Sequence, residues 1–272
     1  MSYLESLVLG IVQGLTEFLP ISSNAHMRIT AALFGWSDPG AAFSAVTQIG
    51  TEVAVLLYFR KDLALIIRAF FKGLTSSKHR KGQDWRLSMF IIIGSLPIAI
   101  LGLLLKDPIE NQFRSLKLIA VSLIVFAIVI GLVDRSAQGD RDLSTLTLAD
   151  SIKFGLAQSL ALIPGVSRSG GTIAAGLALG YSRVAAARYS FLLAIPAVLG
   201  SGVLELSKIG STNAPHWGPT LLATICAFIV GYLVIAWLLK FLTTHTFRGF
   251  MIYRVILGAG VIVLLSTGVI TS

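Results

Sequence analysis

Six apolar segments, each about as long as a membrane-spanning helix, constrain the fold of this 272-residue chain more than any other feature. A helix needs about 20 mostly apolar residues to cross a hydrocarbon core roughly 30 Å thick. Only 13% of the residues are charged, whereas ordinary soluble domains carry about 25%. We therefore predict an all-α polytopic membrane protein. Its six transmembrane helices are expected at residues 41–59, 87–105, 118–134, 187–206, 220–239 and 251–270.

Two further apolar stretches, residues 3–36 and 152–181, are each interrupted by a proline and a run of small polar residues. The prolines are Pro20 and Pro164, and neither continues a helix unaided. Each half is long enough for only about half a bilayer. Because the freed backbone groups need polar partners at that depth, we predict two re-entrant helical hairpins with polar tips.

The two broken stretches match each other at a constant offset of 145 residues, as Gln13 matches Gln158. Each is followed by three predicted spans, so the second unit is expected upside down relative to the first. This pattern predicts an inverted-topology repeat in which the hairpins meet near the membrane midplane. The single membrane domain would comprise residues 1–134 and 150–272, joined by a linker at 135–149.

Basic residues set the expected orientation. Sixteen of the 22 Lys and Arg residues lie in four loops, at 60–86, 135–153, 183–188 and 240–254. The opposite loops hold only Lys106, Arg114, Lys117 and Lys208. The positive-inside rule places the first group in the cytoplasm and both termini outside. Because the basic residues are scattered between apolar runs and form no aromatic-interleaved patch, we expect no nucleic-acid partner.

The long loop at 60–86 contains apolar residues at helical spacing, with Lys and Arg among them. This pattern is typical of an interfacial helix on anionic lipid, and a solvated loop is the alternative. The apolar residues are Leu63, Ile66, Ile67, Phe70, Phe71 and Leu74.

Charged and hydroxyl-bearing residues gather at the two predicted tips. Arg28 and Arg168 are the two basic residues left inside the broken stretches, and intramembrane charge marks a functional site. We expect Arg28 to reach the outer interface and assign it no chemistry. The other polar residues are Glu17 and His26 in the first stretch and the hydroxyls of Ser22, Ser23, Ser167, Ser169 and Thr172 at the tips.

A half-helix begins after each tip, and its free N–H groups, capped by serine, form an anion site. The Arg168 guanidinium would bind phosphate oxygens there. Gly170 and Gly171 leave room for close backbone approach. The predicted phosphate-binding residues are Ser22, Ser167, Ser169, Gly170 and Thr172, together with Arg168.

This set of residues can support hydrolysis of a phosphoanhydride. Ser23 or Ser22 would attack phosphorus with His26 as the acid or base, and direct attack by His26 is the rival. Glu17 would orient His26 or hold a divalent cation, with Gln13 one helical turn before it. Two alternatives stay open: Glu17 and Arg168 form a purely structural pair, and Glu52 makes either a contact with the site or a structural hydrogen bond.

The runs QGLTEFLPISSNAH (13–26) and PGVSRSGGT (164–172) resemble the two signature motifs of the bacterial undecaprenyl pyrophosphate phosphatase family, also called bacitracin-resistance phosphatases. The resemblance implies hydrolysis of undecaprenyl pyrophosphate to undecaprenyl phosphate and inorganic phosphate, which recycles the lipid carrier for cell-wall synthesis. It implies that Glu17 is the acidic position, His26 the essential histidine and Arg168 the phosphate-binding arginine. Ser22 and Ser23 would be the paired serines.

The resemblance also implies a divalent cation, Mg or Ca, with Glu17 and Gln13 as ligands. Gln13 stands where some members have Glu, and Asn24 where most have Ser or Thr. A homodimer in the bacterial cytoplasmic membrane is implied, with its active site open to the extracytoplasmic face. The alternative function is a secondary transporter or lipid flippase, since transporters share this architecture. Serine, histidine and glutamate beside an anion site favour hydrolysis, because binding alone needs no nucleophile.

Overall fold

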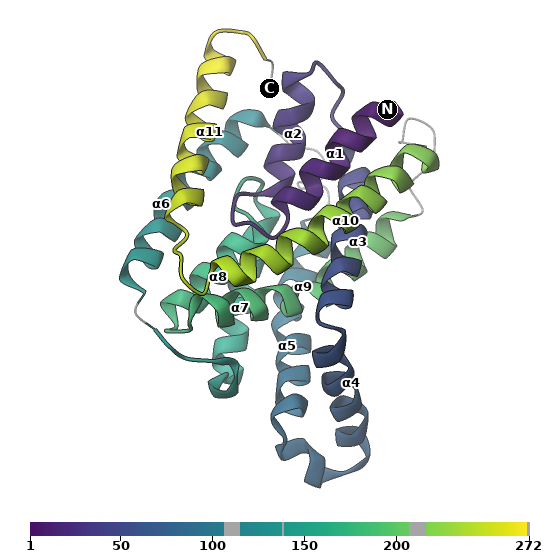
Figure 1. The fold of residues 1–272 in the computed structure, drawn as a ribbon, viewed down its shortest axis with the longest axis vertical. Coiled ribbons are helices and arrows are strands. Elements are labelled where there is room, and N and C mark those ends of the chain that lie inside the picture. Colours follow the sequence, from purple (N-terminus) through teal and green to yellow (C-terminus); the bar gives the residue numbers. More distant parts are fainter. Residues whose placement is uncertain (106–114, 138, 207–215, 271–272) are drawn as a thin grey trace.

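The computed structural model describes residues 1–105, 115–137, 139–206 and 216–270, and over these residues it contains eleven α-helices and no strand (Figure 1). Six of the helices are long and apolar enough to cross a membrane, so the prediction of a polytopic, all-α membrane protein with six spans is confirmed. They are α3 (Gly40–Tyr58), α5 (Gln83–Leu104), α6 (Leu116–Ser136), α9 (Arg183–Leu206), α10 (Trp217–Phe241) and α11 (Arg248–Ser266).

Shorter helices flank the two predicted breaks. The first stretch forms α1 (Tyr3–Thr16) and α2 (Ser23–Leu33), and the second forms α7 (Leu148–Ser159) and α8 (Arg168–Ala178). We call the segments between them, residues 17–22 and 160–167, the first and second tip loops; the second opens with the 3-10 turn η4 (Leu160–Leu162).

Ser22 and Ser167 end the two tip loops in the same way. Both have positive φ angles, 73° and 76°, in the left-handed region that residues other than glycine rarely adopt. Each is also the N-cap of the next helix, where the hydroxyl accepts a backbone N–H from Ala25 in α2 or from Gly170 in α8. The backbone therefore turns sharply just before the first residue of each new helix.

Glycines let the first helix of each pair approach a long helix closely. A Cβ on Gly10 of α1 would lie 2.5 Å from the Ala223 carbonyl oxygen of α10, and one on Gly155 of α7 would lie 2.2 Å from the Gly94 oxygen of α5. Small residues permit such contact in membranes, where packing drives association. As a result α1 packs on α10 and α7 packs on α5. Each tip loop directly follows one of these two short helices, so this packing positions it along the bundle.

The amphipathic part of the 60–86 segment is helix α4 (Arg60–Thr75), followed by the 3-10 turn η1 (Ser77–Lys81). With the start of α5 it forms a hairpin that protrudes at the end of the molecule opposite both termini (Figure 1). Exposed Ile67, Phe71 and Leu74 line one face of α4. Contact of this face with lipid stays a prediction.

The structure corrects the assignment of Arg254 to a cytoplasmic loop. Arg254 lies in the second turn of α11 and is fully buried. The four basic segments therefore keep fifteen Lys and Arg residues, and the expected orientation does not change. The 183–188 segment, predicted as a loop, is the first part of α9. Lys106, Arg114 and Lys208 of the opposite loops lie outside the described residues.

Candidate active site

The two tip loops meet at an ion pair between residues far apart in the sequence. Nη2 of Arg168, the first residue of α8, donates to Oε1 of Glu17 over 2.7 Å. Both side chains are largely buried, with 13% and 3% exposed. Ser169 adds a second link, because its hydroxyl donates to the Leu19 carbonyl oxygen over 3.0 Å. A Glu17–Arg168 pair, which the sequence left open, is therefore present in the structure.

The second carboxylate oxygen of Glu17 is also engaged. Oε2 accepts a hydrogen bond from the Ser23 hydroxyl over 2.6 Å and another from Nε2 of Gln13 over 2.7 Å. Three donors thus surround one buried carboxylate and offset the cost of removing it from water. The amide oxygen of Gln13 is buried and has no hydrogen-bond partner among the described residues.

His26 lies beside this cluster with both ring nitrogens in contact. Nδ1 is 2.8 Å from the Ser22 carbonyl oxygen, and Nε2 is 2.7 Å from the Tyr253 hydroxyl, whose ring stacks on the imidazole. Because a carbonyl only accepts, we assign the proton of the neutral ring to Nδ1, which leaves Nε2 to accept from Tyr253. Glu17 contacts Ser23 and not His26 in this structure, so the orienting partners of His26 are Ser22 and Tyr253.

Arg254 ties both tip loops to the transmembrane bundle. Its Nη1 donates to the carbonyl oxygens of Pro20 (2.8 Å) and Val166 (3.1 Å), which belong to different tip loops. Nη2 and Nε donate to the carbonyl oxygens of Gly165 (2.7 Å) and Leu123 (3.2 Å). Sequence reasoning missed both Arg254 and Tyr253. The available signal was a charged residue inside an expected span, 251–270, with no acidic residue near it in the sequence.

Of the remaining predicted phosphate-binding residues, some cap the helices that follow the tip loops, and one is turned away from the ion pair. Ser22 and Ser167 cap their helices, and Ser167 also pairs with the Ser169 hydroxyl. The N–H of Gly170 is used by the Ser167 cap. Thr172 is fully buried and turned away from the cluster, since its hydroxyl bonds the Arg168 carbonyl oxygen and Ser190 of α9.

Two charged residues of the predicted set form no ion pair with Glu17 or Arg168 among the described residues. Arg28 pairs with Asp38 at 3.3 Å. Glu52 of α3 is 1% exposed, and its Oε1 has no hydrogen-bond partner among the described residues. A contact of Glu52 with the site stays a prediction.

The chain is similar to known proteins along nearly its whole length. A model of the family "Bacitracin resistance protein BacA" matches residues 6–260. The chain is 57% identical to an undecaprenyl-diphosphatase of Nocardioides sp. over 271 residues, 99% of each chain. It is 55% identical to undecaprenyl-diphosphatase 2 of Streptomyces coelicolor over all of this chain and 97% of that one. It is 51% identical to an undecaprenyl-diphosphatase of Thermobifida fusca, with 100% and 93% covered.

Proposed function

The chain belongs to the bacitracin resistance protein BacA family, and from this premise we infer that it is an undecaprenyl-diphosphatase embedded in the membrane. It hydrolyses undecaprenyl diphosphate to undecaprenyl phosphate and inorganic phosphate and so recycles the lipid carrier for cell-wall synthesis. The observation that carries this conclusion within the fold is the Glu17 carboxylate, which contacts a hydroxyl of one tip and a guanidinium of the other. The relatives give no support to the transporter or flippase alternative.

For the architecture we propose two re-entrant hairpins within an inverted repeat of residues 1–134 and 150–272, linked at 135–149. The equal φ angles and caps of Ser22 and Ser167, which are 145 positions apart, support the repeat. The packing of α1 on α10 and of α7 on α5 supports it as well, because each pair joins a helix of one half to a helix of the other.

The diphosphate binds where the two tips meet. Arg168 uses one N–H on Glu17 and has further N–H groups in the plane of the guanidinium for phosphate oxygens. The first turns of α2 and α8 add backbone N–H groups and the positive ends of two helix dipoles. Ser22, Ser167 and Ser169 hold these helix starts in place, and Gly170 allows close approach. Thr172 supports the start of α8 from behind.

Ser23 is the nucleophile of the proposed reaction. Its hydroxyl oxygen attacks the terminal phosphorus while its proton passes to Oε2 of Glu17. The bond to the bridging oxygen breaks, and undecaprenyl phosphate leaves with that oxygen, its charge stabilised by Arg168. The Tyr253 hydroxyl then gives up its contact with Nε2 of His26, and a water that passes a proton to Nε2 attacks the phosphoserine. Ser23 leaves with the proton held by Glu17, and His26 passes its proton to the departing inorganic phosphate, so both groups return to their starting states. The rival is direct attack by Nε2 of His26.

A divalent cation, Mg or Ca, fits one side of this cluster. The buried Gln13 amide oxygen without a partner and the Glu17 carboxylate offer the hard oxygen ligands such ions prefer, with substrate phosphates completing the shell. Within the described part of the chain no three His, Cys, Asp or Glu side chains converge on one point. The cation would therefore bind together with the substrate and neutralise its charge. Removal with EDTA should abolish phosphate release, and Mg or Ca should restore it.

The enzyme is proposed to lie in the bacterial cytoplasmic membrane with its site open to the extracytoplasmic face. The excess of basic residues in the α4 hairpin and the other cytoplasmic loops supports this orientation. Family resemblance supports a homodimer, which crosslinking in native membranes would test.

Phosphate release from undecaprenyl diphosphate by the detergent-solubilised protein tests the function. Arg168→Ala and His26→Ala should abolish release while the protein stays folded, and Arg28→Ala, a matched arginine outside the site, should retain it. Near-normal turnover in either site variant would refute the assignment. Trapping a phosphoenzyme separates the nucleophiles, because phosphoserine survives acid and is lost in alkali, whereas phosphohistidine behaves in the opposite way.

A further inference from the structure

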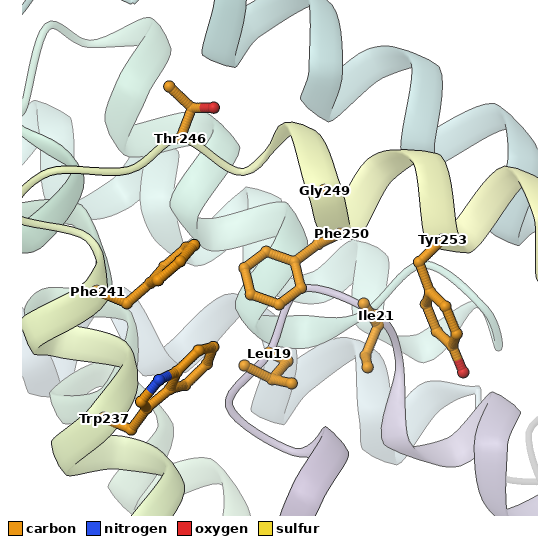
Figure 2. A pocket seen from close by; sticks show the side chains of 8 residues that line it. All are labelled: Leu19, Ile21, Trp237, Phe241, Thr246, Gly249, Phe250 and Tyr253. Atoms are coloured by element: carbon orange, nitrogen blue, oxygen red, sulfur yellow. The ribbon is translucent and has the colours of Figure 1, made fainter.

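An apolar cavity of about 390 Å³ lies against the first tip loop, between the end of α10 and the start of α11 (Figure 2). Its size is within the range of small-molecule sites, about 300–1,000 Å³. Three elements line it: the first tip loop with Leu19 and Ile21, helix α10 with Trp237 and Phe241, and the connection and first turns of α11 with Thr246, Gly249, Phe250 and Tyr253.

Tyr253 is a wall shared by this cavity and the polar cluster. Its side chain lines the cavity (Figure 2). Its hydroxyl is 2.7 Å from Nε2 of His26. Leu19 and Ile21 connect the same two regions along the chain, because they lie two and four residues after Glu17 in the first tip loop. The cavity and the polar cluster are therefore neighbours, separated by one tyrosine side chain and bordered by the same loop.

The composition of the walls selects the kind of occupant. Aromatic and aliphatic side chains make up most of the lining, so a polar group placed there would lose hydrogen bonds to water without replacement. Trp237 is 49% exposed and Tyr253 is 43% exposed, so the far side of the cavity opens at the surface of the bundle. In a membrane this surface faces lipid, and a long chain can continue outward from it.

We propose that this cavity binds the first isoprene units of the polyprenyl substrate, those joined directly to the diphosphate. The proposal rests on the proposed function, because it places the diphosphate at Arg168 and Ser23 on the other side of Tyr253. Flat alkene units of an isoprenoid pack well on the rings of Phe241 and Phe250. The enzyme thus recognises the part of the chain next to the headgroup, and the distal part of the chain remains in the membrane.

Filling the cavity from Gly249 tests the proposal. A Cβ on Gly249 would meet no atom within 4 Å, so Gly249→Leu places a side chain in open space without displacing the fold. Gly260→Leu is the matched control, because Gly260 lies on the same helix, is equally open and does not line the cavity. The substrate is farnesyl diphosphate. Inorganic pyrophosphate, tested as a competitive inhibitor, reports on the headgroup site without any chain.

We expect Gly249→Leu to raise KM for farnesyl diphosphate roughly ten- to hundredfold, the usual range for misfit in an apolar pocket. The value of kcat should change little, because the lost contact is equal in the ground and transition states. The inhibition constant of pyrophosphate should stay at the wild-type value, and Gly260→Leu should behave as wild type throughout. Phe250→Ala, which removes a wall, should raise KM in the same selective way if Gly249→Leu fails to fold.

The outcomes separate this proposal from the proposed function. Wild-type protein that hydrolyses neither farnesyl nor undecaprenyl diphosphate overturns the function. Hydrolysis by wild type with an unchanged KM in Gly249→Leu overturns the subsite alone, and is also the result expected if an ordinary membrane lipid fills the cavity. If Gly249→Leu weakens pyrophosphate inhibition as well as raising KM, the headgroup site is generally damaged, and this result would also overturn the subsite proposal.

Discussion

Replacing Arg254 tests whether one buried guanidinium holds the two tip loops together. In Arg254→Met the side-chain volume is roughly kept, and the four hydrogen bonds to Pro20, Val166, Gly165 and Leu123 are lost. Hydrogen bonds from a charged donor contribute about 1.5–3 kcal/mol each, or about 6–12 kcal/mol in all. Part of this is offset because a charged group no longer has to be buried. The four carbonyl oxygens that lose their donor are neutral, so we take a net cost of about 3–5 kcal/mol, at the upper end of the range for single substitutions.

This loss of free energy should loosen the contact between the two tip loops. Among the described residues, no other charged side chain donates to backbone carbonyl oxygens of both loops. Since 1.4 kcal/mol corresponds to a factor of ten, the equilibrium constant for alignment of Glu17 on Arg168 should fall by roughly two to four powers of ten. We therefore expect kcat for phosphate release to fall by up to this factor in Arg254→Met. Arg254→Lys should also lower kcat, because one ammonium cannot replace the four hydrogen bonds that three guanidinium nitrogens make.

The assay combines phosphate release with thermal unfolding in detergent. Arg248→Met is the control, because Arg248 lies on the same helix and is exposed. A selective fall in kcat, with KM and thermal unfolding less affected, identifies Arg254 as a positioning residue, whereas loss of all three together indicates general unfolding. Wild-type kcat/KM in Arg254→Met would show that the tip loops do not need it and would refute the reasoning.

Three further changes have defined outcomes. Ser167→Ala should lower stability by about 1 kcal/mol, measured by thermal unfolding, because the cap is lost at a φ of 76°, whereas Ser167→Gly should be nearly neutral because glycine accepts that angle. Gly50→Ala should destabilise the protein by about 1–3 kcal/mol, since its Cβ would lie 2.1 Å from the Thr224 carbonyl oxygen. Gly200→Ala is the control, because a Cβ there would meet no atom within 4 Å. Equal unfolding temperatures for the two variants would contradict the close packing at Gly50. Gln13→Glu replaces a hydrogen-bond donor to Glu17 with a second carboxylate. It should therefore lower the cation concentration needed for half-maximal activity and, in EDTA, lower the thermal unfolding temperature. An unchanged cation requirement would exclude Gln13 from the cation site.

The spans and the two breaks could be predicted from the sequence because lipid imposes a simple rule on composition. Long apolar runs become helices, and a proline followed by a run of small polar residues interrupts them at Pro20 and Pro164, whereas the isolated Pro97 and Pro196 lie inside continuous helices. The same rule made Glu17 and Arg168 stand out, since charges inside apolar runs need partners. Their ion pair across the tips follows from this need.

Arg254 and Tyr253 could not be predicted in the same way. The partners of Arg254 are backbone carbonyl oxygens, which every residue carries, so no side chain in the sequence reveals them. Tyr253 meets His26 only because α11 packs beside α2, a tertiary fact without a local pattern. The contact of Ser23 with Glu17, in place of a contact between Glu17 and His26, depends on the left-handed turn at Ser22, which sets the direction of the following helix.

The proposed repeat explains why the two tips share a backbone and differ in chemistry. At the offset of 145 residues, Ser23 corresponds to Arg168, whereas His26 corresponds to Gly171 and has no equivalent in function. Two identical tips would bring like charges together, either two carboxylates or two guanidiniums, and each arrangement is costly in a buried site. Cleavage of a diphosphate needs both kinds of group, one to accept protons and one to neutralise phosphate charge. Two tips with the same backbone turn but different side chains meet both requirements. The first tip carries the groups that accept and donate protons, and the second carries the positive charge.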